Sequence, residues 1–403
     1  MAEKKAVNKV VEPTNEEIDA HVDQLVAKAQ IALSKFEEFT QEQVDYIVAK
    51  CSVAGLDAHG TLAEAAVNET GRGVFEDKAV KNLFACEYVT SNLRHLKTVG
   101  IINEDPLLGI TEIAEPVGVV CGIVPTTNPT STVIFKSLIC LKTRNPIIFS
   151  FHPSAHACSV MAAVVIRDAA IAAGAPEDCI QWLDLKSMYA TTALMKHPGV
   201  ATILATGGNA MVAAAYSCGK PALGVGAGNV PAYVEKTCVL PRAVNDIVLS
   251  KSFDNGMICA SEQAAIVDAE IYDAFMKEIK RFKVYFVNKD EKAKLEQFMF
   301  GAVSYSDNVN AAKLNPNVVG KPATWIAEQA GFKVPEDTQI ICAECKEVGP
   351  NEPLTREKLS PVLAVLKATS TEDGILKATQ MVEFNGLGHS AAIHTEDHEI
   401  SKK

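Results

Sequence analysis

Apolar side chains recur at helical spacing along the first hundred residues. Ile18, Val22 and Val26 are spaced four apart and follow residues 14–17 (TNEE), a capping box that predicts a helix start. Residues 40–43 (TQEQ) predict the start of a second helix in the same way. Two further helices are expected around residues 62–70 and 78–97. This part of the chain is therefore expected to be mostly helical.

The hydrophobic pattern changes near residue 101, where short apolar runs begin to alternate with helical segments. Strands are expected at residues 115–125, 146–151, 179–183 and 200–205, and an alanine-rich helix at residues 155–174. Strands that alternate with helices of this length are typical of parallel βαβ units.

The same alternation restarts at about Pro241. Strands are expected at residues 263–268, 339–343, 361–367 and 390–394, helices at 243–251, 271–282, 291–299 and 372–384, and a looser stretch at 314–335. These patterns predict an α/β protein with two lobes, residues 1–240 and residues 241–403.

The composition is that of an ordinary globular enzyme, with 403 residues, 48% apolar residues, 22% charged residues and a net charge of -11. The sequence contains no basic tract, which argues against nucleic-acid binding. The most apolar helical segment, near residues 159–175, is interrupted by Arg167 and Asp168, and we expect it to fall short of a membrane span. Residues 1–5 (MAEKK) lead into no apolar run, so no secretory signal is predicted.

The 11 cysteines are scattered without a regular spacing. This distribution fits reduced thiols in the cytoplasm better than disulfides, and we expect a cytoplasmic protein. Cys342 and Cys345 form a lone CxxC pair. Without a second pair of ligands, no metal site is expected there.

Cys259 lies in residues 252–263 (SFDNGMICASEQ), between a predicted helix and a predicted strand. Gly256 precedes it by three residues, and glycine permits tight turns that point backbone amides inward. Such amides can hold a thiolate, or the oxyanion that forms when the thiolate attacks a carbonyl. The alternative is a buried core cysteine, which is the commoner case. No Lys, Arg or His lies within five positions, so the sequence alone gives no argument about the pKa of this thiol.

Two glycine-containing turns are candidate ligand sites. Thr206, Gly207 and Gly208 lie between a predicted strand and a predicted helix, where free amides suit a phosphate, although a plain tight turn is the alternative. Residues 224–231 (GVGAGNVP) superficially suggest a dinucleotide fingerprint, which needs a strand before it and a helix after it. Here a helix precedes and a strand at residues 232–235 follows. We therefore expect only a glycine lining that lets a ligand approach the backbone.

Three polar side chains are further candidates. Asn128, in residues 125–129 (PTTNP), can donate its amide to an oxyanion, and an ordinary Asn-Pro turn is the alternative. Glu357 precedes a predicted strand, where most glutamates are only solvated. His389, in the glycine loop at residues 386–390, can assist proton transfer, and a surface turn is the alternative.

The order of these motifs resembles the aldehyde dehydrogenase superfamily. That order is strand-PxxNP, strand-TGG-helix, a glycine loop, FDNGxxC and ExxxPV. The sequence is most similar to the N-terminal aldehyde dehydrogenase half of bifunctional aldehyde–alcohol dehydrogenases. The stretches that carry this resemblance are residues 69–77 (ETGRGVFED), 127–132 (TNPTST), 142–146 (KTRNP) and 253–263 (FDNGMICASEQ).

The resemblance implies a coenzyme A (CoA)-acylating, NAD-dependent aldehyde dehydrogenase with two Rossmann-like three-layer αβα lobes. Residues 1–240 would bind NAD, residues 241–403 would carry the nucleophile, and a hairpin near residues 101–116 would serve oligomerisation. By the same resemblance Cys259 is the nucleophile, Asn128 the oxyanion donor and His389 the residue that serves the CoA step. The residues expected at the cofactor site are Pro125, Thr126, Thr206, Gly207, Gly208, Gly224, Gly226 and Glu357, the last on the nicotinamide ribose.

Two departures from the family pattern change this expectation. Hydrolytic members carry Glu-Leu-Gly-Gly where this chain has residues 224–227 (GVGA), and that glutamate activates water. Without this glutamate, we expect the acyl-enzyme to react with the thiol of CoA and not with water. The lysine that many relatives use on the adenosine ribose is replaced near His152, so no NADP preference is predicted.

The reaction expected from the resemblance is reversible reduction of acetyl-CoA to acetaldehyde in ethanol fermentation. The expected partners are these small molecules and further copies of the chain, which in longer relatives form helical filaments. The chain stops early in a predicted helix, which we interpret as a fragment of a longer protein. Three alternatives stay open: a hydrolytic NAD-dependent aldehyde dehydrogenase, a mainly structural filament-building domain, and a thiol-dependent acyltransferase that uses no nicotinamide.

Overall fold

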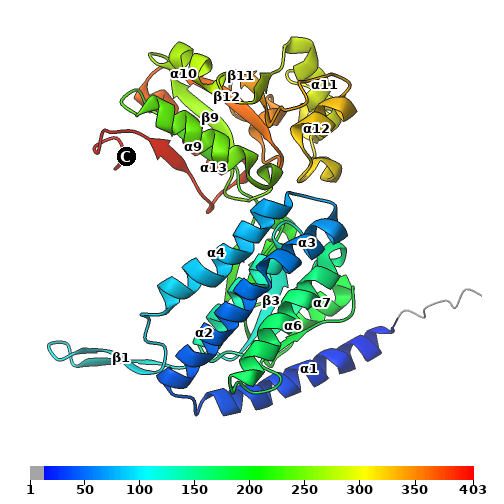
Figure 1. Ribbon diagram of the computed structural model, residues 1–403, viewed down its shortest axis with the longest axis vertical. Coiled ribbons are helices and arrows are strands. Elements are labelled where there is room, and N and C mark those ends of the chain that lie inside the picture. The colour runs from blue at the N-terminus through cyan, green and yellow to red at the C-terminus, as the bar shows by residue number, and fades with distance from the viewer. Residues whose placement is uncertain (1–12) are drawn as a thin grey trace, which may run out of the picture.

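The computed structural model describes residues 13–403. Residues 1–5, in which no secretory signal is predicted, lie outside this range. Figure 1 shows two α/β lobes, one above the other, with the C-terminus in the upper lobe. The first lobe contains a five-stranded sheet, the second contains a six-stranded sheet, and a two-stranded hairpin is separate from both. The predicted two-lobed α/β fold is therefore confirmed.

Four helices precede the first sheet, and both predicted capping boxes form. The Thr14 hydroxyl accepts the N–H of Glu17 at 3.2 Å, and the Thr40 hydroxyl accepts the N–H of Gln43 at 3.3 Å. The four helices are α1 (Asn15–Phe36), α2 (Gln41–Asp57), α3 (His59–Thr70) and α4 (Phe75–Leu93).

The first sheet is parallel and is covered by helices on both faces. Its elements are β3 (Val119–Val124), α5 (Pro129–Lys142), β4 (Ile147–Phe151), α6 (His156–Ala172), β5 (Ile180–Trp182), α7 (Met188–Lys196), β6 (Val200–Thr206), α8 (Asn209–Tyr216) and β7 (Ala222–Val225). The strand order is β5-β4-β3-β6-β7. Along β3, Val119, Cys121 and Ile123 face the core under α1 and α7, while Val120 and Val124 face the core under α2, α5 and α6.

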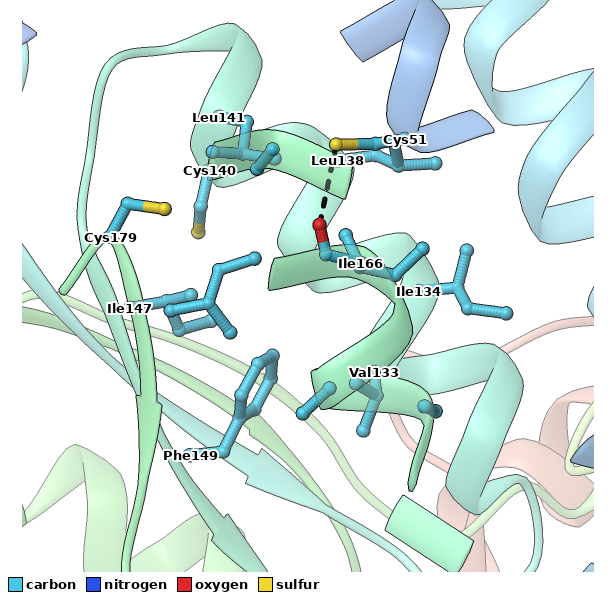
Figure 2. Close-up of a cluster of buried hydrophobic side chains, with 14 of the residues drawn as sticks. Cys51, Val133, Ile134, Leu138, Cys140, Leu141, Ile147, Phe149, Ile166 and Cys179 are labelled. Atoms are coloured by element: carbon cyan, nitrogen blue, oxygen red, sulfur yellow. Dashed lines mark hydrogen bonds between the residues drawn. The ribbon is translucent and has the colours of Figure 1, made fainter. Parts of the chain in front are cut away.

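The core under α2, α5 and α6 contains several thiols, some of which Figure 2 shows among aliphatic and aromatic side chains. Cys51, Cys140 and Cys179 are buried there, and the thiol of Cys51 donates to the carbonyl oxygen of Ile166 at 3.5 Å. Burial raises the pKa of Cys140 and of Cys179 to about 12. These thiols are therefore protonated and serve as packing.

The second sheet is also parallel and is covered on both faces. Its elements are β8 (Val230–Val234), α9 (Leu240–Ser252), β9 (Glu262–Asp268), α10 (Tyr272–Ile279), β10 (Val284–Phe286), α11 (Lys289–Phe300), α12 (Ala323–Ala330), β11 (Ile340–Cys345), β12 (Val362–Ala368), α13 (Thr371–Asn385) and β13 (Ala392–His394). The strand order is β10-β11-β12-β9-β8-β13. Helices α9 and α10 pack on one face, and α11, α12 and α13 pack on the other.

Three details of the sequence-based prediction need correction. The boundary between the lobes lies before residue 230 and not at residue 240, because β8 pairs with β9 and β13 in the second sheet. Strands β7 and β10 were not predicted, because runs of three or four residues carry too little alternation to stand out from turns. The stretch expected to be looser, residues 314–335, contains helix α12.

An antiparallel hairpin leads from α4 into the first sheet. Its strands are β1 (Gly100–Asp105) and β2 (Ile110–Ala114), close to the predicted hairpin at residues 101–116. Leu107 is 97% exposed and Leu108 is 72% exposed at its tip. Figure 1 shows the hairpin projecting away from both lobes.

The segment Pro153–Ala172, which includes α6, is long and apolar enough to cross a membrane, with a mean hydropathy of 1.5. This corrects the expectation that it falls short of a span. In the structure 39% of the segment's apolar window is buried, and α6 packs against α2 and α5. Core helices commonly have this composition, so the segment is weak evidence for a membrane span.

Candidate active site

A cavity of about 230 Å³, which we call the Cys259 cavity, lies where the two lobes meet. The first lobe contributes the carboxyl ends of β3 and β6, and the second lobe contributes Cys259, Glu357 and Leu359. The chain runs from β3 outward through β4 and β5 before it returns to β6, and ligands of parallel sheets bind at such a reversal of strand order. The other lining residues are Arg72, Pro125, Thr126, Thr127, Asn128, His152, Thr206, Gly207, Gly208, Gly226, Ala227 and Val319.

This cavity brings together all of the predicted site residues except Gly224 and His389. Residues from positions 125 to 357 converge on it, although they follow different strands of two different sheets. The predicted Asn128, Cys259 and Glu357 therefore share one site, which spacing along the chain could not establish.

Cys259 is placed by a strained loop of residues 253–259, which we call the Cys259 loop. Asp254, Asn255 and Gly256 all have positive φ, and a Cβ on Gly256 would lie 2.4 Å from the carbonyl oxygen of Ser360. Only glycine fits at position 256, as the motif predicts. Cys259 is half-buried, whereas eight of the 11 cysteines are buried. The core-cysteine interpretation of Cys259 is therefore wrong.

Opposing effects act on the pKa of the Cys259 thiol. Burial raises the pKa, the neighbouring Glu357 raises it further, and Lys81 and the backbone amides of Cys259 and Ala260 lower it. The net direction is upward. The thiol therefore needs a base or a cation nearby before it can act as a thiolate nucleophile.

Asn128 is the first residue before α5, but its side chain does not cap that helix. Its Oδ1 atom instead accepts a hydrogen bond from the Nζ of Lys81 at 2.7 Å. The Asn128 amide is consequently available to the cavity, where it can donate to an oxyanion.

Glu357 is tied to the backbone on the cavity wall and is not merely solvated. Its Oε1 accepts the N–H of Gly228 at 2.8 Å. Burial raises the pKa of Glu357 to about 7, against the lowering effects of the Gly228 hydrogen bond and of Lys251 and Lys358. The cavity thus contains a carboxyl group whose pKa lies near neutral pH.

Gly224 faces away from Cys259. It lies in β7, where a Cβ would meet the Cγ1 of Val212 at 2.6 Å, and it lines a neighbouring cavity of about 570 Å³. The lack of a glutamate at position 224 therefore does not decide whether water is activated beside Cys259.

His389 also lines the neighbouring cavity, but it lies close to Cys259. A Cβ on Gly228 would be 2.3 Å from the Cys259 carbonyl oxygen and 3.1 Å from the His389 ring. The Nε2 of His389 is buried and has no hydrogen-bond partner among residues 13–403. Burial lowers the pKa of His389, so the ring is neutral at pH 7 and can accept a proton.

The glycine turn after β6 leaves room for an elongated anionic ligand. Thr206, Gly207 and Gly208 line both the Cys259 cavity and an adjoining cavity of about 370 Å³ that also contains His152. A Cβ on Gly208 would meet nothing within 4 Å, so the amino end of α8 is open to approach. Backbone amides at such a helix start suit a phosphate.

Comparison with known proteins identifies the family. The model of the aldehyde dehydrogenase family matches residues 3–403. The chain belongs to the aldehyde dehydrogenase family.

Individual aldehyde dehydrogenases match over nearly the whole chain. Aldehyde-alcohol dehydrogenase 2 of Entamoeba histolytica is 69% identical over 96% of the chain, which spans 45% of that relative. An acetylating aldehyde dehydrogenase from Geobacillus thermoglucosidasius is 43% identical with a TM-score of 0.91, over 97% of this chain and 85% of that one. Propionaldehyde dehydrogenase of Rhodopseudomonas palustris, solved with bound CoA and an acylated cysteine, is 29% identical with a TM-score of 0.81, over 94% and 84% of the two chains.

Sequence reasoning missed several charged residues at this aldehyde dehydrogenase site. Asp254 is fully buried and pairs with Lys78 and Lys81 from α4. The sequence did offer a signal, because Asp254 and Arg72 lie within stretches that resemble the family, residues 253–263 and 69–77, and Lys78 directly follows the second of these stretches. Arg72, also missed, lines the cavity. Across residues 13–403, no group of three or more His, Cys, Asp or Glu side chains is arranged to hold a metal ion.

Proposed function

We propose that this chain is an acetaldehyde dehydrogenase of the CoA-acylating kind, which reversibly reduces acetyl-CoA to acetaldehyde with NADH in the cytoplasm. The observation that carries the proposal is the convergence of Cys259, Asn128 and Glu357 with the open glycine turn in one cavity. The first lobe would bind NAD and the second would supply the nucleophile.

In the proposed reaction the Cys259 thiolate attacks the thioester carbonyl of acetyl-CoA. The amides of Asn128 and of the Cys259 backbone stabilise the oxyanion that forms. The C–S bond to CoA then breaks, the CoA thiolate leaves, and the acetyl group remains on Cys259 as a thioester. In the reverse direction His389, which is neutral and whose Nε2 has no partner in the described part of the chain, can accept the proton of the CoA thiol.

The second half of the reaction reduces the acyl group. Pro125, Thr126 and the glycine turn would hold NADH, which would supply a hydride to the thioester carbon. The resulting thiohemiacetal oxyanion lies against the same amides, and its collapse releases acetaldehyde and the Cys259 thiolate. We assign the contact with the cofactor ribose to Glu357, which lines the cavity.

A hydrolytic aldehyde dehydrogenase is the second candidate, because Glu357 lies beside Cys259 and titrates near pH 7. General-base help of this kind typically contributes about 10²–10⁴-fold. Acetate produced without CoA as fast as CoA is acylated would favour this alternative.

We infer further that copies of this chain associate through the exposed β1–β2 hairpin. Its tip residues Leu107 and Leu108 are exposed and apolar, and contiguous apolar surface of this kind supports protein contacts. Association into filaments belongs to the same proposal.

The function is tested by mixing acetyl-CoA with NADH and following NADH absorbance. We expect wild type to oxidise NADH and Cys259→Ala to lose turnover while still binding NADH. Cys238→Ala is the matched control, because Cys238 is the same residue type, is also half-buried and lies outside the Cys259 cavity. Equal turnover in Cys259→Ala and wild type would move the nucleophile elsewhere. No turnover in folded wild type, with acyl transfer intact, would favour an acyltransferase without nicotinamide.

A further inference from the structure

Lys81 joins the oxyanion residue to a buried charge in the other lobe. Its Nζ donates to Oδ1 of Asn128 at 2.7 Å and also to Oδ2 of Asp254. The same Nζ lies 5.7 Å from the centre of the Phe253 ring. The ammonium group of Lys81 is thus surrounded by an amide oxygen, a carboxylate and an aromatic ring. Its side chain is only 8% exposed.

The contact with Lys81 determines which way the Asn128 amide points. A lysine ammonium has donors and no acceptor, so only the Oδ1 side of the amide can face it. The Nδ2 side must then point elsewhere, and among residues 13–403 it makes one hydrogen bond, a long contact of 3.3 Å to the hydroxyl of Thr127. Asn128 lines the cavity beside Cys259, so its remaining donor capacity is available there.

The charge of Lys81 strengthens this arrangement. An ammonium on the amide oxygen polarises the amide and makes its N–H bonds better donors. Asp254 offsets part of this buried positive charge, since it accepts from Lys78 at 3.2 Å and from the N–H of Val74 at 2.7 Å as well as from Lys81.

We propose that Lys81 is a positioning residue that holds the Asn128 amide with its N–H bonds toward the oxyanion formed on Cys259. This inference deepens the proposed function and rests on it for the identity of the substrate. It does not depend on the cofactor, because acylation of Cys259 by any activated ester passes through the same oxyanion.

The test measures the burst of p-nitrophenolate from p-nitrophenyl acetate, beside the acetyl-CoA and NADH assay. The ester carbonyl is attacked by the Cys259 thiolate, p-nitrophenolate leaves, and a thioester remains on the enzyme. Asn128→Ala is expected to slow acylation by about 10²–10³-fold, the usual cost of losing an oxyanion donor, and Lys81→Met by roughly tenfold. In an Asn128→Ala background, Lys81→Met is expected to have no further effect on the acylation rate.

Lys142→Met is the matched control. It removes another buried lysine that pairs with a carboxylate, Asp45, but it lies outside the cavity and leaves the Lys81 contact with Asn128 intact. Thermal unfolding of the two lysine variants should show similar losses, while only Lys81→Met slows acylation. Equal slowing in both variants, or undiminished slowing by Lys81→Met when Asn128 is absent, would overturn the inference.

The two proposals fail in different ways. A burst with the expected pattern but no NADH oxidation by acetyl-CoA would reject the proposed function and support the role of Lys81. NADH oxidation with additive effects of Lys81→Met and Asn128→Ala would reject the role of Lys81 alone. The absence of both p-nitrophenolate release and NADH oxidation from folded wild type would reject both.

Discussion

The Cys259 loop and the β1–β2 hairpin are both turns that depend on a glycine with positive φ. Gly256 in the loop has φ of 66° and Gly109 in the hairpin has φ of 65°. A Cβ on Gly256 would lie 2.4 Å from Ser360 backbone, whereas a Cβ on Gly109 would meet nothing within 4 Å. Both glycines therefore need a left-handed backbone conformation, but Gly256 is tightly packed and Gly109 is open to solvent.

This contrast separates two reasons for a glycine. The hairpin turn is shaped by its own backbone and by the ladder between its two strands. The Cys259 loop is shaped by neighbours from both lobes, including Asp77, whose carboxylate accepts the N–H of Asp254 at 2.7 Å. A loop held by such contacts can keep Asp254 and Asn255 at positive φ. Backbone strain of this kind is typical of functional sites.

The largest expected effect comes from Gly256→Ala, compared with Gly109→Ala. Both substitutions place a side chain at positive φ, which costs about 1–2 kcal/mol. Gly256→Ala adds steric overlap in a packed interior, typically about 1–3 kcal/mol more. Urea unfolding measures both losses. Equal losses in the two variants would mean that the packing around Gly256 relaxes freely and that the comparison fails.

An intermediate effect is expected from Glu357→Gln, with Glu112→Gln in the exposed hairpin as control. The folded-state pKa of Glu357, about 7, lies above its ordinary value of 4.5. Its contribution to the free energy of unfolding is therefore full below pH 4.5 and is lost as pH rises through about 7. We expect Glu357→Gln to remove a fall in stability on the order of 1–3 kcal/mol between pH 5 and pH 8.

The measurement is urea unfolding of wild type and both glutamine variants at the two pH values. Glutamine retains an oxygen for the Gly228 N–H, so the variant isolates the titration from the hydrogen bond. Glu112→Gln should follow the wild-type pH profile. A Glu357→Gln profile parallel to wild type would show that folding does not raise the pKa of Glu357.

The smallest effect on stability is expected from a double change, Leu107→Ser with Leu108→Ser. Both side chains are exposed, so the free energy of unfolding should stay within about 0.5 kcal/mol of wild type. Association should weaken, which multi-angle light scattering over a range of protein concentrations would detect. An unchanged mass distribution would exclude the hairpin tip as the contact between copies.

Much of the fold could be predicted from local sequence signals. The capping boxes at Thr14 and Thr40 mark helix starts because their contacts span only three residues. The apolar runs that form β3 and β4 are unmistakable because both faces of the sheet are buried. The boundary at β8 was misplaced because sheet membership depends on pairing with distant strands, which no local pattern encodes.

The site was predictable only where a motif carried the information. Asn128, Cys259 and Glu357 were found through the order of motifs, and the glycine at position 256 has the role that its motif predicts. The pairing of Lys81 with Asp254 was missed because it joins positions 173 residues apart in different lobes. Gly224 lines the neighbouring cavity because the short strand β7, which was not predicted, turns it away from Cys259.

The passage of the chain between the two sheets has a mechanical consequence. Between residues 13 and 403 the backbone crosses from β7 to β8 once, through residues 226–229. Gly226 and Ala227 of this crossing line both the Cys259 cavity and its larger neighbour. Any rocking of one lobe against the other must be absorbed by torsions in the cavity wall itself. Ligand occupancy and the angle between the lobes are therefore linked equilibria, and each ligand that touches both lobes biases that angle.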